Sequence, residues 1–488
     1  MTRRVAVGLA LVGVVGLAAA GCGSGSDSGA PPPAPQVAGP AADRGTASYD
    51  AAVSTPQEDT VYPDVGDPGV DSLHYDLDLA WDPKRETLTG RETLLFRAAT
   101  TADHVQLDLA RQLEVSHVWL DGKAVDFDHP GKDLVVDASV TEGDRHVLQV
   151  GYSGTPEPVK APTDRGDFTT TGWTTTPDGS AWTMQEPFGG YSWYAVNDQP
   201  SDKAMYDLTI HAPKDMVGVA NGVLRSRRTS GGHTVTRWRL TSPAASYLVT
   251  VAIGRYTETK DTGPHGLPIT YWTPTGRADV LRKVRYAPQA VAYLEGLVGR
   301  YPFDSLGVLI VPGDSGMETQ TMVTLGDNKY TLSKDVVVHE IAHQWYGDAV
   351  TPDDWSDLWM SEGMTTYLAE ANWTGSHGPK SRTAILREWS MFVAGLRATY
   401  GPPADYRPES FGQGNVYYIP GLMWDTIRQR LGDTTFWRIA AAWPRSHRYT
   451  SQSRDSLAAW WSKQAGQDLR PLFHDWLLAP TEPAWNAG

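Results

Sequence analysis

The sequence predicts a multidomain α+β protein, in which an N-terminal β-sandwich-like domain precedes a mixed α/β domain with helices at its C-terminal end. With 488 residues, the chain is too long for one ordinary domain. Hydrophobic residues make up 40% of the sequence, enough for more than one buried core. The hydrophobic pattern has a period of two from about residue 68 to about residue 257 and a helical period after about residue 270.

Residues 1–22 have the pattern of a signal peptide. Arg3 and Arg4 precede an apolar run from Val5 to Ala20, which is short for a membrane span. Ala19-Ala20-Gly21-Cys22 resembles a bacterial lipobox, in which cleavage before the cysteine is followed by lipid attachment to it. We therefore expect an exported protein that contacts the outer face of the cytoplasmic membrane only through a lipid on Cys22. The alternative is a plain secretory signal and a secreted chain.

Residues 23–58 consist mainly of Gly, Ser, Ala, Pro and Asp, with Ala30-Pro31-Pro32-Pro33-Ala34-Pro35 near the middle. Such a composition buries too little apolar surface to form a core. This segment is predicted to be a disordered tether.

Residues 59–257 are predicted to form the β domain. Turn residues such as Asp121-Gly122 and Gly231-Gly232 separate segments in which apolar and polar residues alternate, as expected for half-buried strands. The alternating segments include 74–79, 105–109, 147–150, 206–210 and 234–238.

Residues 258–488 are predicted to form the second domain. Apolar residues from Val280 to Val298 recur every three or four positions, which predicts one long helix kinked at Pro288. A buried strand is predicted over Leu306–Val311. Two of the helices predicted toward the C-terminus are Leu422–Leu431 and Leu457–Gln464.

The charge of the chain argues against a nucleic-acid partner. There are 57 acidic and 42 basic residues, giving a formal net charge of −15, and no basic tract stands out. The acidity is explained by solubility alone.

An H-E-x-x-H motif lies in a segment with helical character. On a helix, His339 and His343 project from one face, so both imidazoles can reach one metal ion, with Glu340 beside them as a candidate base. Eighteen residues separate His343 from Glu362, a candidate third ligand. Two His and one carboxylate leave a fourth position open, which is typical of catalytic zinc. A lone motif of this kind can also occur on any solvated helix.

The residues that flank the motif argue against an accidental occurrence on a solvated helix. His339–Asp348 and Trp355–Gly363 resemble the zinc site of the aminopeptidase N family, which includes the leukotriene hydrolases. The resemblance extends roughly from residue 68 to 479. It implies a thermolysin-like catalytic domain with one Zn²⁺ per chain on His339, His343 and Glu362, and Glu340 as the general base.

Two further segments resemble the family's substrate-binding motifs. Ser315-Gly316-Met317-Glu318-Thr319 is similar to G-x-M-E-N, which implies that Gly316 and Met317 contact the substrate and that Glu318 binds its α-amino group. Gln185-Glu186-Pro187 resembles the family's Q-x-E segment and implies a second amine-binding carboxylate, Glu186. Taken without its neighbours, a glutamate after a strand is usually a solvated loop residue.

The segment Val416-Tyr417-Tyr418-Ile419-Pro420-Gly421 is similar to the family's V-Y-x-K-G-A. The family's oxyanion-binding tyrosine lies three residues before the glycine, which implies Tyr418, with Tyr417 as the rival if the register differs by one. A tyrosine packed at the start of a helix is the structural alternative.

Together these patterns predict a zinc aminopeptidase acting on peptides with a free N-terminus. One alternative is a zinc endopeptidase of relaxed exo-specificity, favoured by the changes at Ser315 and Thr319. The other is a catalytically inactive surface-binding protein, which the complete set of site residues argues against.

Overall fold

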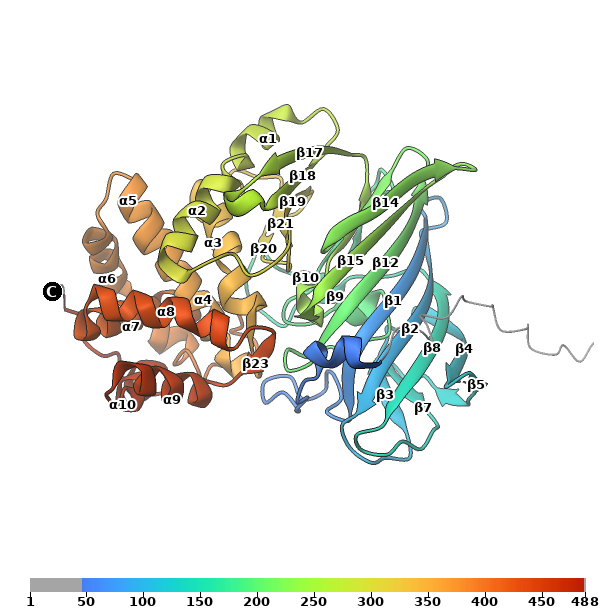
Figure 1. The fold of residues 1–488 in the computed structure, drawn as a ribbon, viewed down its shortest axis with the longest axis horizontal. Coiled ribbons are helices and arrows are strands. Elements are labelled where there is room, and N and C mark those ends of the chain that lie inside the picture. The colour runs from blue at the N-terminus through green and yellow to red at the C-terminus, as the bar shows by residue number, and fades with distance from the viewer. Residues whose placement is uncertain (1–45, 487–488) are drawn as a thin grey trace, which may run out of the picture. The chain divides into compact units, whose positions relative to one another are not determined.

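The structure is a computed structural model that describes residues 46–486 (Figure 1). The predicted signal peptide, Cys22 and the predicted tether up to residue 45 lie outside the described residues. Among the residues that are described, no helix combines the length and apolar character needed to cross a membrane.

The last part of the predicted tether is ordered, which corrects its expected boundary at residue 58. Thr46–Ala52 form a 3-10 helix. The Gln57 side chain then donates a hydrogen bond to the Asp353 carbonyl oxygen at 3.0 Å, and the Ser54 amide donates to Asp71 at 2.9 Å. These residues contact both domains, so local composition alone misplaced the end of the predicted tether.

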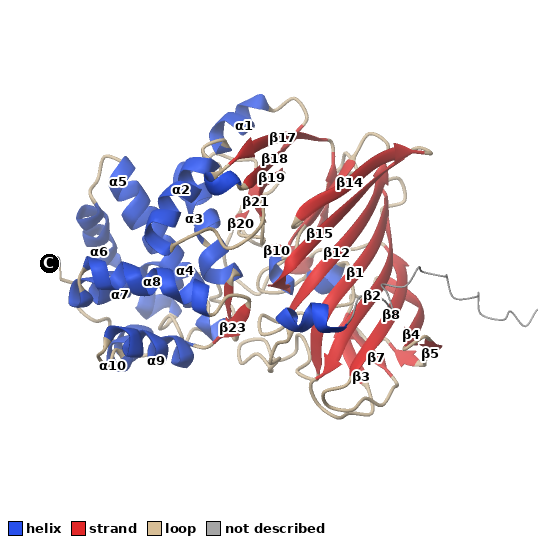
Figure 2. Ribbon diagram, viewed as in Figure 1, coloured by secondary structure: helices blue, strands red, loops and turns tan. Residues whose placement is uncertain are grey.

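The N-terminal domain is built on an eight-stranded sheet, whose long strands form the largest sheet in Figure 2. β1 (Val70–Asp82) pairs in parallel with β12 (Lys203–Pro213) and antiparallel with β2 (Thr87–Ala98). Alternate residues of β1, including Leu77 and Leu79, are fully buried, as the period of two predicts. In spatial order the strands are β14 (Val223–Ser230), β15 (His233–Ala245), β12 (Lys203–Pro213), β1 (Val70–Asp82), β2 (Thr87–Ala98), β8 (Arg145–Gly154), β4 (Leu113–Leu120) and β5 (Lys123–Ala124).

Two smaller sheets complete this domain. Every alternating segment singled out in the sequence lies wholly or almost wholly in a strand, and the predicted β-rich domain is confirmed. The five-stranded sheet contains β13 (Val217–Ala220), β16 (Val251–Gly254), β11 (Ala181–Met184), β10 (Thr170–Thr175) and β9 (Val159–Lys160), and the three-stranded sheet contains β3 (Val105–Asp108), β7 (Asp133–Val136) and β6 (Phe127–Asp128).

The second domain begins with a mixed five-stranded sheet. The predicted strand over Leu306–Val311 is its central strand, β19, all of whose residues are buried. In order, the strands are β17 (Tyr256–Thr262), β18 (Pro268–Pro274), β19 (Leu306–Val311), β21 (Met322–Gly326) and β20 (Gly316–Met317). Because β20 lies at the edge of this sheet, the backbone of Gly316 and Met317 is available beside the helices that follow.

The predicted long helix over 280–298 is two helices, α1 (Ala278–Val284) and α2 (Ala287–Val298). Proline has no amide hydrogen, and its ring clashes with the carbonyl four residues earlier, here that of Val284. The helix therefore stops and restarts with Pro288 in its first turn, where proline is tolerated.

The remaining helices lie on the same side of the eight-stranded sheet, as Figure 2 shows. The short strands β22 (Val350–Pro352) and β23 (Thr450–Gln452) pair between them. The helices are α3 (Lys334–Ala342), α4 (Trp359–Thr366), α5 (Gly375–His377), α6 (Arg382–Tyr400), α7 (Asn415–Leu431), α8 (Asp433–Ser446), α9 (Arg454–Ala465) and α10 (Arg470–Leu477). A β-rich domain, a mixed domain and C-terminal helices were predicted, and this order is confirmed.

Candidate active site

The H-E-x-x-H motif is carried by α3. The Ser333 side chain caps the helix by accepting a hydrogen bond from the Val336 amide. Val337, Val338 and Ile341 are buried and form the inner face of the helix. His339 and His343 are one turn apart, and their Nε2 atoms lie 3.0 Å from each other. His343 ends the regular helix, and its Nδ1 lies 3.1 Å from the Tyr346 carbonyl oxygen, a contact that orients the ring.

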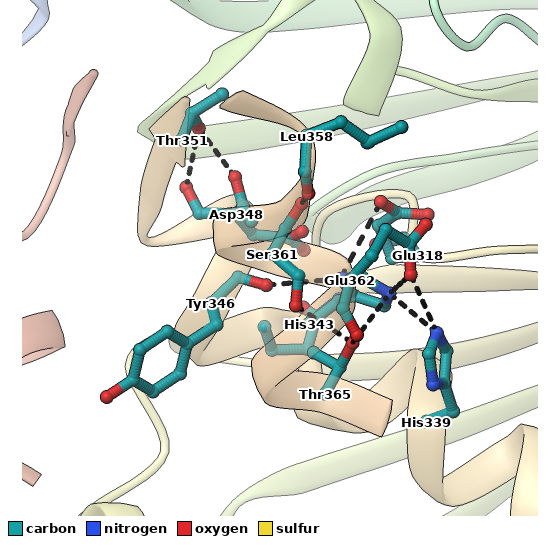
Figure 3. Close-up of polar contacts among 12 residues, drawn as sticks. Glu318, His339, His343, Tyr346, Asp348, Thr351, Leu358, Ser361, Glu362 and Thr365 are labelled. Atoms are coloured by element: carbon teal, nitrogen blue, oxygen red, sulfur yellow. Dashed lines mark hydrogen bonds and ion pairs between the residues drawn. The ribbon is translucent and has the colours of Figure 1, made fainter. Parts of the chain in front are cut away.

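Glu362 reaches the two imidazoles from α4 (Figure 3). Its Oε2 lies 3.1 Å from His339 Nε2 and 3.3 Å from His343 Nε2. Burial opposes ionisation of Glu362, but the charge of His343 and hydrogen bonds from both rings outweigh it and hold the pKa of this carboxyl below its usual range. The carboxylate and the two ring nitrogens therefore converge on one point.

These three donors fit a zinc ion. Ligands about 2.0–2.1 Å from a tetrahedral metal lie roughly 3.4 Å apart, close to the separations seen among His339, His343 and Glu362. Burial lowers the pKa of His339, which favours the neutral imidazole that metals bind.

Glu340 faces the edge strand β20. A side-chain carbon at Gly316 would lie 2.5 Å from Glu340 Oε1, so the glycine is required for this close approach. Burial and the neighbouring Glu318 raise the pKa of Glu340 well above its ordinary value. A carboxylate with a raised pKa beside a metal-ligand set can accept and return a proton near neutral pH.

Glu318 and Glu186 bring two more carboxylates to the site, one from each domain. Glu186 follows β11 of the N-terminal domain, and Glu318 follows β20. Oxygens of Glu186, Glu318 and Glu362 all lie within 4.8 Å of one another. Glu186 Oε1 and Glu318 Oε1 are buried and lack hydrogen-bond partners among the described residues. Burial and mutual repulsion raise the pKa of Glu186, and burial raises that of Glu318.

The structure places Tyr417, rather than Tyr418, against the ligand set. The Tyr417 ring centroid lies 6.1 Å from that of His339, and burial together with the Glu362 carboxylate raises the pKa of its phenol. Tyr418 packs edge-on against Trp389 and Phe392 of α6. The geometry therefore favours Tyr417, the rival left open by the register, over Tyr418 for the place beside the ligand set. Consecutive residues of a helix point about 100° apart, so only one of the two tyrosines can face the ligand set. With Tyr417 as the family's tyrosine, Ile419 takes the place of the lysine, and Pro420, which packs against Gly363 of α4, takes that of the glycine.

Arg165 is a site residue that the sequence did not reveal. Its Nη1 donates to the Tyr417 hydroxyl at 3.0 Å and to the Gly412 carbonyl at 3.1 Å, while Nη2 pairs with Asp167 at 2.7 Å. It therefore fixes the position of the phenol. Arg165 lies in an irregular loop of the N-terminal domain with no motif or period, so one sequence carries no signal for it.

All of the predicted site residues line one cavity of about 680 Å³. Its wall includes Glu186, Gly316, Met317, Glu318, His339, Glu340, His343, Glu362 and Tyr418. Ser315 also lines it. The Thr319 hydroxyl instead donates a hydrogen bond to the carbonyl oxygen of Met322, the first residue of β21.

Two family profiles match this chain. The peptidase M1 N-terminal domain matches residues 71–248, and the peptidase family M1 domain matches residues 292–400. Aminopeptidase 2 of Candida albicans is 25% identical over 83% of this chain and 47% of its own length. Aminopeptidase M1 of Arabidopsis thaliana is 23% identical over 62% of this chain and 37% of its own. The chain thus spans less than half the length of these curated relatives.

Solved structures have the same fold. A mutant of a two-domain M1 zinc metallopeptidase, bound to L-arginine, superposes with a TM-score of 0.80 at 24% identity, covering 88% of this chain and 98% of that one. An M1 zinc metallopeptidase from Deinococcus radiodurans gives a TM-score of 0.78 with the same identity and coverage. With both domain profiles matched in order and the two-domain fold shared, this chain belongs to peptidase family M1.

Proposed function

We propose that the protein is a zinc-dependent aminopeptidase that removes N-terminal residues from peptides. The observation that carries this proposal is the pair of carboxylates, Glu186 and Glu318, held beside the metal-ligand set with buried, unbonded oxygens. Buried carboxylate oxygens without hydrogen-bond partners are costly, and a substrate α-ammonium group supplies positive charge and the missing hydrogen bonds.

The proposed chemistry follows from the site geometry. His339, His343 and Glu362 would hold Zn²⁺, which would supply a Lewis acid able to lower the pKa of a bound water and to polarise the scissile carbonyl. Glu340 takes the proton from the attacking water and delivers it to the leaving amine. The Tyr417 phenol, which keeps its proton because its pKa is raised, donates a hydrogen bond to the developing oxyanion.

The amine-binding pair sets which bond is cut. With the α-ammonium fixed at Glu186 and Glu318, only the first peptide bond lies within reach of Glu340 and Tyr417. An endopeptidase would place an uncharged peptide segment against these two carboxylates and leave their buried oxygens unpaired. The geometry therefore favours exopeptidase action. A structure of another family M1 enzyme, from Deinococcus radiodurans, was solved with the substrate Tyr-Ser-Ala.

A panel of aminoacyl fluorogenic amides tests the proposal. We expect hydrolysis of several members, loss of activity on chelation, and recovery when one equivalent of zinc is returned. Activity that survives complete removal of the metal would contradict the zinc mechanism. A zinc-loaded protein that cleaves no amide but cuts longer, N-blocked peptides would favour the endopeptidase.

We further propose that the protein is exported and held at the outer face of the cytoplasmic membrane by lipid on Cys22. The support is the sequence alone: Arg3-Arg4, the apolar run, and the lipobox-like residues before the chain's only cysteine. Mass spectrometry of the mature N-terminus tests this. A mature chain that begins at residue 22 with an acyl group is expected, and an unmodified Cys22 would contradict it.

A further inference from the structure

A second group of carboxylates lines the same cavity, toward the N-terminal end of α3. Asp335 lies in the first turn of α3, one turn before His339, whereas Glu318 contacts His343 at the opposite end, with Oε1 3.7 Å from Nδ1. Eight residues of helix span about 12 Å. A peptide whose amine is bound at Glu318 and whose first carbonyl faces the zinc ligands therefore directs its next residue toward Asp335.

Glu370 lies on this second wall, in the helical segment that follows α4, and Glu388 projects from α6. The carboxylates differ in their partners. Glu388 pairs with Lys380 at 2.7 Å, and Asp335 accepts a hydrogen bond from Thr374 at 2.6 Å. Glu370 has neither a hydrogen-bond nor an ion-pair partner among the residues that the structure describes.

The surroundings of Glu370 make its charge unfavourable in the empty cavity. Desolvation and, to a smaller extent, repulsion from Asp335 raise the pKa of Glu370 to about 7. A cation bound in the cavity near Glu370 and Asp335 offsets both penalties. The same wall carries the apolar side chains of Ile385 and Trp389, against which the methylene stem of a long basic side chain can pack.

We propose that Glu370, together with Asp335, selects peptides with lysine or arginine immediately after the bond that is cut. The inference rests on the proposed aminopeptidase function and names the substrate class of that site. Glu370 acts here as a specificity residue: it touches the leaving part of the peptide and takes no part in bond cleavage.

The test compares Leu-Lys-Gly with Leu-norleucine-Gly and Leu-acetyllysine-Gly, which keep the stem of lysine without its charge. We expect kcat/KM for the lysine peptide to exceed both by about 10-fold or more, as for a hydrogen-bonded charge pair. In Glu370→Gln this ratio should fall to about 1–2. A ratio near one in the parent enzyme, or one unchanged by Glu370→Gln, would overturn the proposal.

Two further variants distinguish a specific loss of charge recognition from general disruption of the cavity wall. Glu388→Gln makes the same change on the same wall, but its carboxylate is already paired with Lys380, so the lysine-to-norleucine ratio should hold within about twofold. Glu370→Lys should reverse the preference toward glutamate after the scissile bond. Loss of the preference in Glu388→Gln as well would contradict a specific role for Glu370.

A binding measurement tests the proposed selectivity for lysine or arginine separately from the proposed aminopeptidase activity. A leucine fluorogenic amide has no side chain on the leaving side, so its hydrolysis reports the proposed function alone. Calorimetry with zinc-loaded Glu340→Gln needs no turnover. Tighter binding of Leu-Lys-Gly than of Leu-norleucine-Gly there, lost on adding Glu370→Gln, supports the charge recognition even if no amide is cut. Equal binding overturns it.

Discussion

The metal-ligand helices and the start of α7 supply neighbouring parts of the same site, yet they differ in how firmly the sequence specifies them. His339 and His343 lie four residues apart on a regular helix, so their convergence follows from helical geometry. At the start of α7, Tyr417 and Tyr418 are adjacent, and only one can face the ligands. Spacing within a helix therefore predicts a site residue better than alignment to a motif whose neighbours have changed.

The largest expected effect is at the helix-borne base. Glu340→Gln should lower kcat about 10²–10⁴-fold, because the amide cannot accept the water's proton. The zinc ligands are untouched, so metal analysis should still find one zinc per chain. Loss of the metal together with activity would show that Glu340 supports the ligand set instead of acting as a base.

Substitution of the two tyrosines tests the assignment at the start of α7. Tyr417→Phe should lower kcat about 10²–10³-fold with little change in KM, because an oxyanion donor acts mainly in the transition state. Tyr418→Phe is the matched control. Its hydroxyl has no hydrogen-bond partner among the described residues, so steady-state kinetics should change by no more than about twofold. The opposite ranking would restore Tyr418 as the oxyanion donor.

The amine-binding pair should give intermediate effects. Glu186→Gln and Glu318→Gln each remove one charge from the proposed ammonium site, and each should lower kcat/KM for aminoacyl amides about 10–100-fold, mainly through KM. Kinetics over a range of amide concentrations measure this. Unchanged KM values in both variants would sink the role of these carboxylates in binding the N-terminus.

A smaller effect is expected in the pH dependence. Glu340 must be ionised to act as a base, and its pKa is raised, so kcat/KM should fall as pH drops through a value above 4.5. Removing the Glu318 charge by Glu318→Gln should lower the pKa of Glu340 and move this acid limb to lower pH. Glu186 influences the pKa of Glu340 less than Glu318 does, so Glu186→Gln should move the limb less than Glu318→Gln.

The sequence predicts the domain order and the strand segments, because these depend on local periodicity. It brings His339 and His343 together through spacing within one helix, whereas Glu362, on α4, follows only from the resemblance to the family motif. It predicts a kink at Pro288 but misses the complete break between α1 and α2. The helical period of the apolar residues continues across residues 285–286, where the helix is interrupted because of Pro288. It also misses Arg165, whose contact with Tyr417 joins residues 252 positions apart. Long-range contacts from irregular loops leave no local pattern.

The ordered end of the predicted tether illustrates the same limit. Gln57 lies in a stretch whose composition predicts disorder, but it bonds to Asp353 in the other domain, 296 residues away. Composition describes what a segment can bury by itself. It does not describe the surface that the rest of the chain offers to it.

We propose above that binding of a free N-terminus positions the first peptide bond for zinc-dependent cleavage. The most direct test incubates the zinc-loaded protein with a tripeptide and with its N-acetylated form, and follows the products by mass spectrometry. We predict release of the first residue from the free peptide and no cleavage of the acetylated one. Cleavage of both at similar rates would contradict the account.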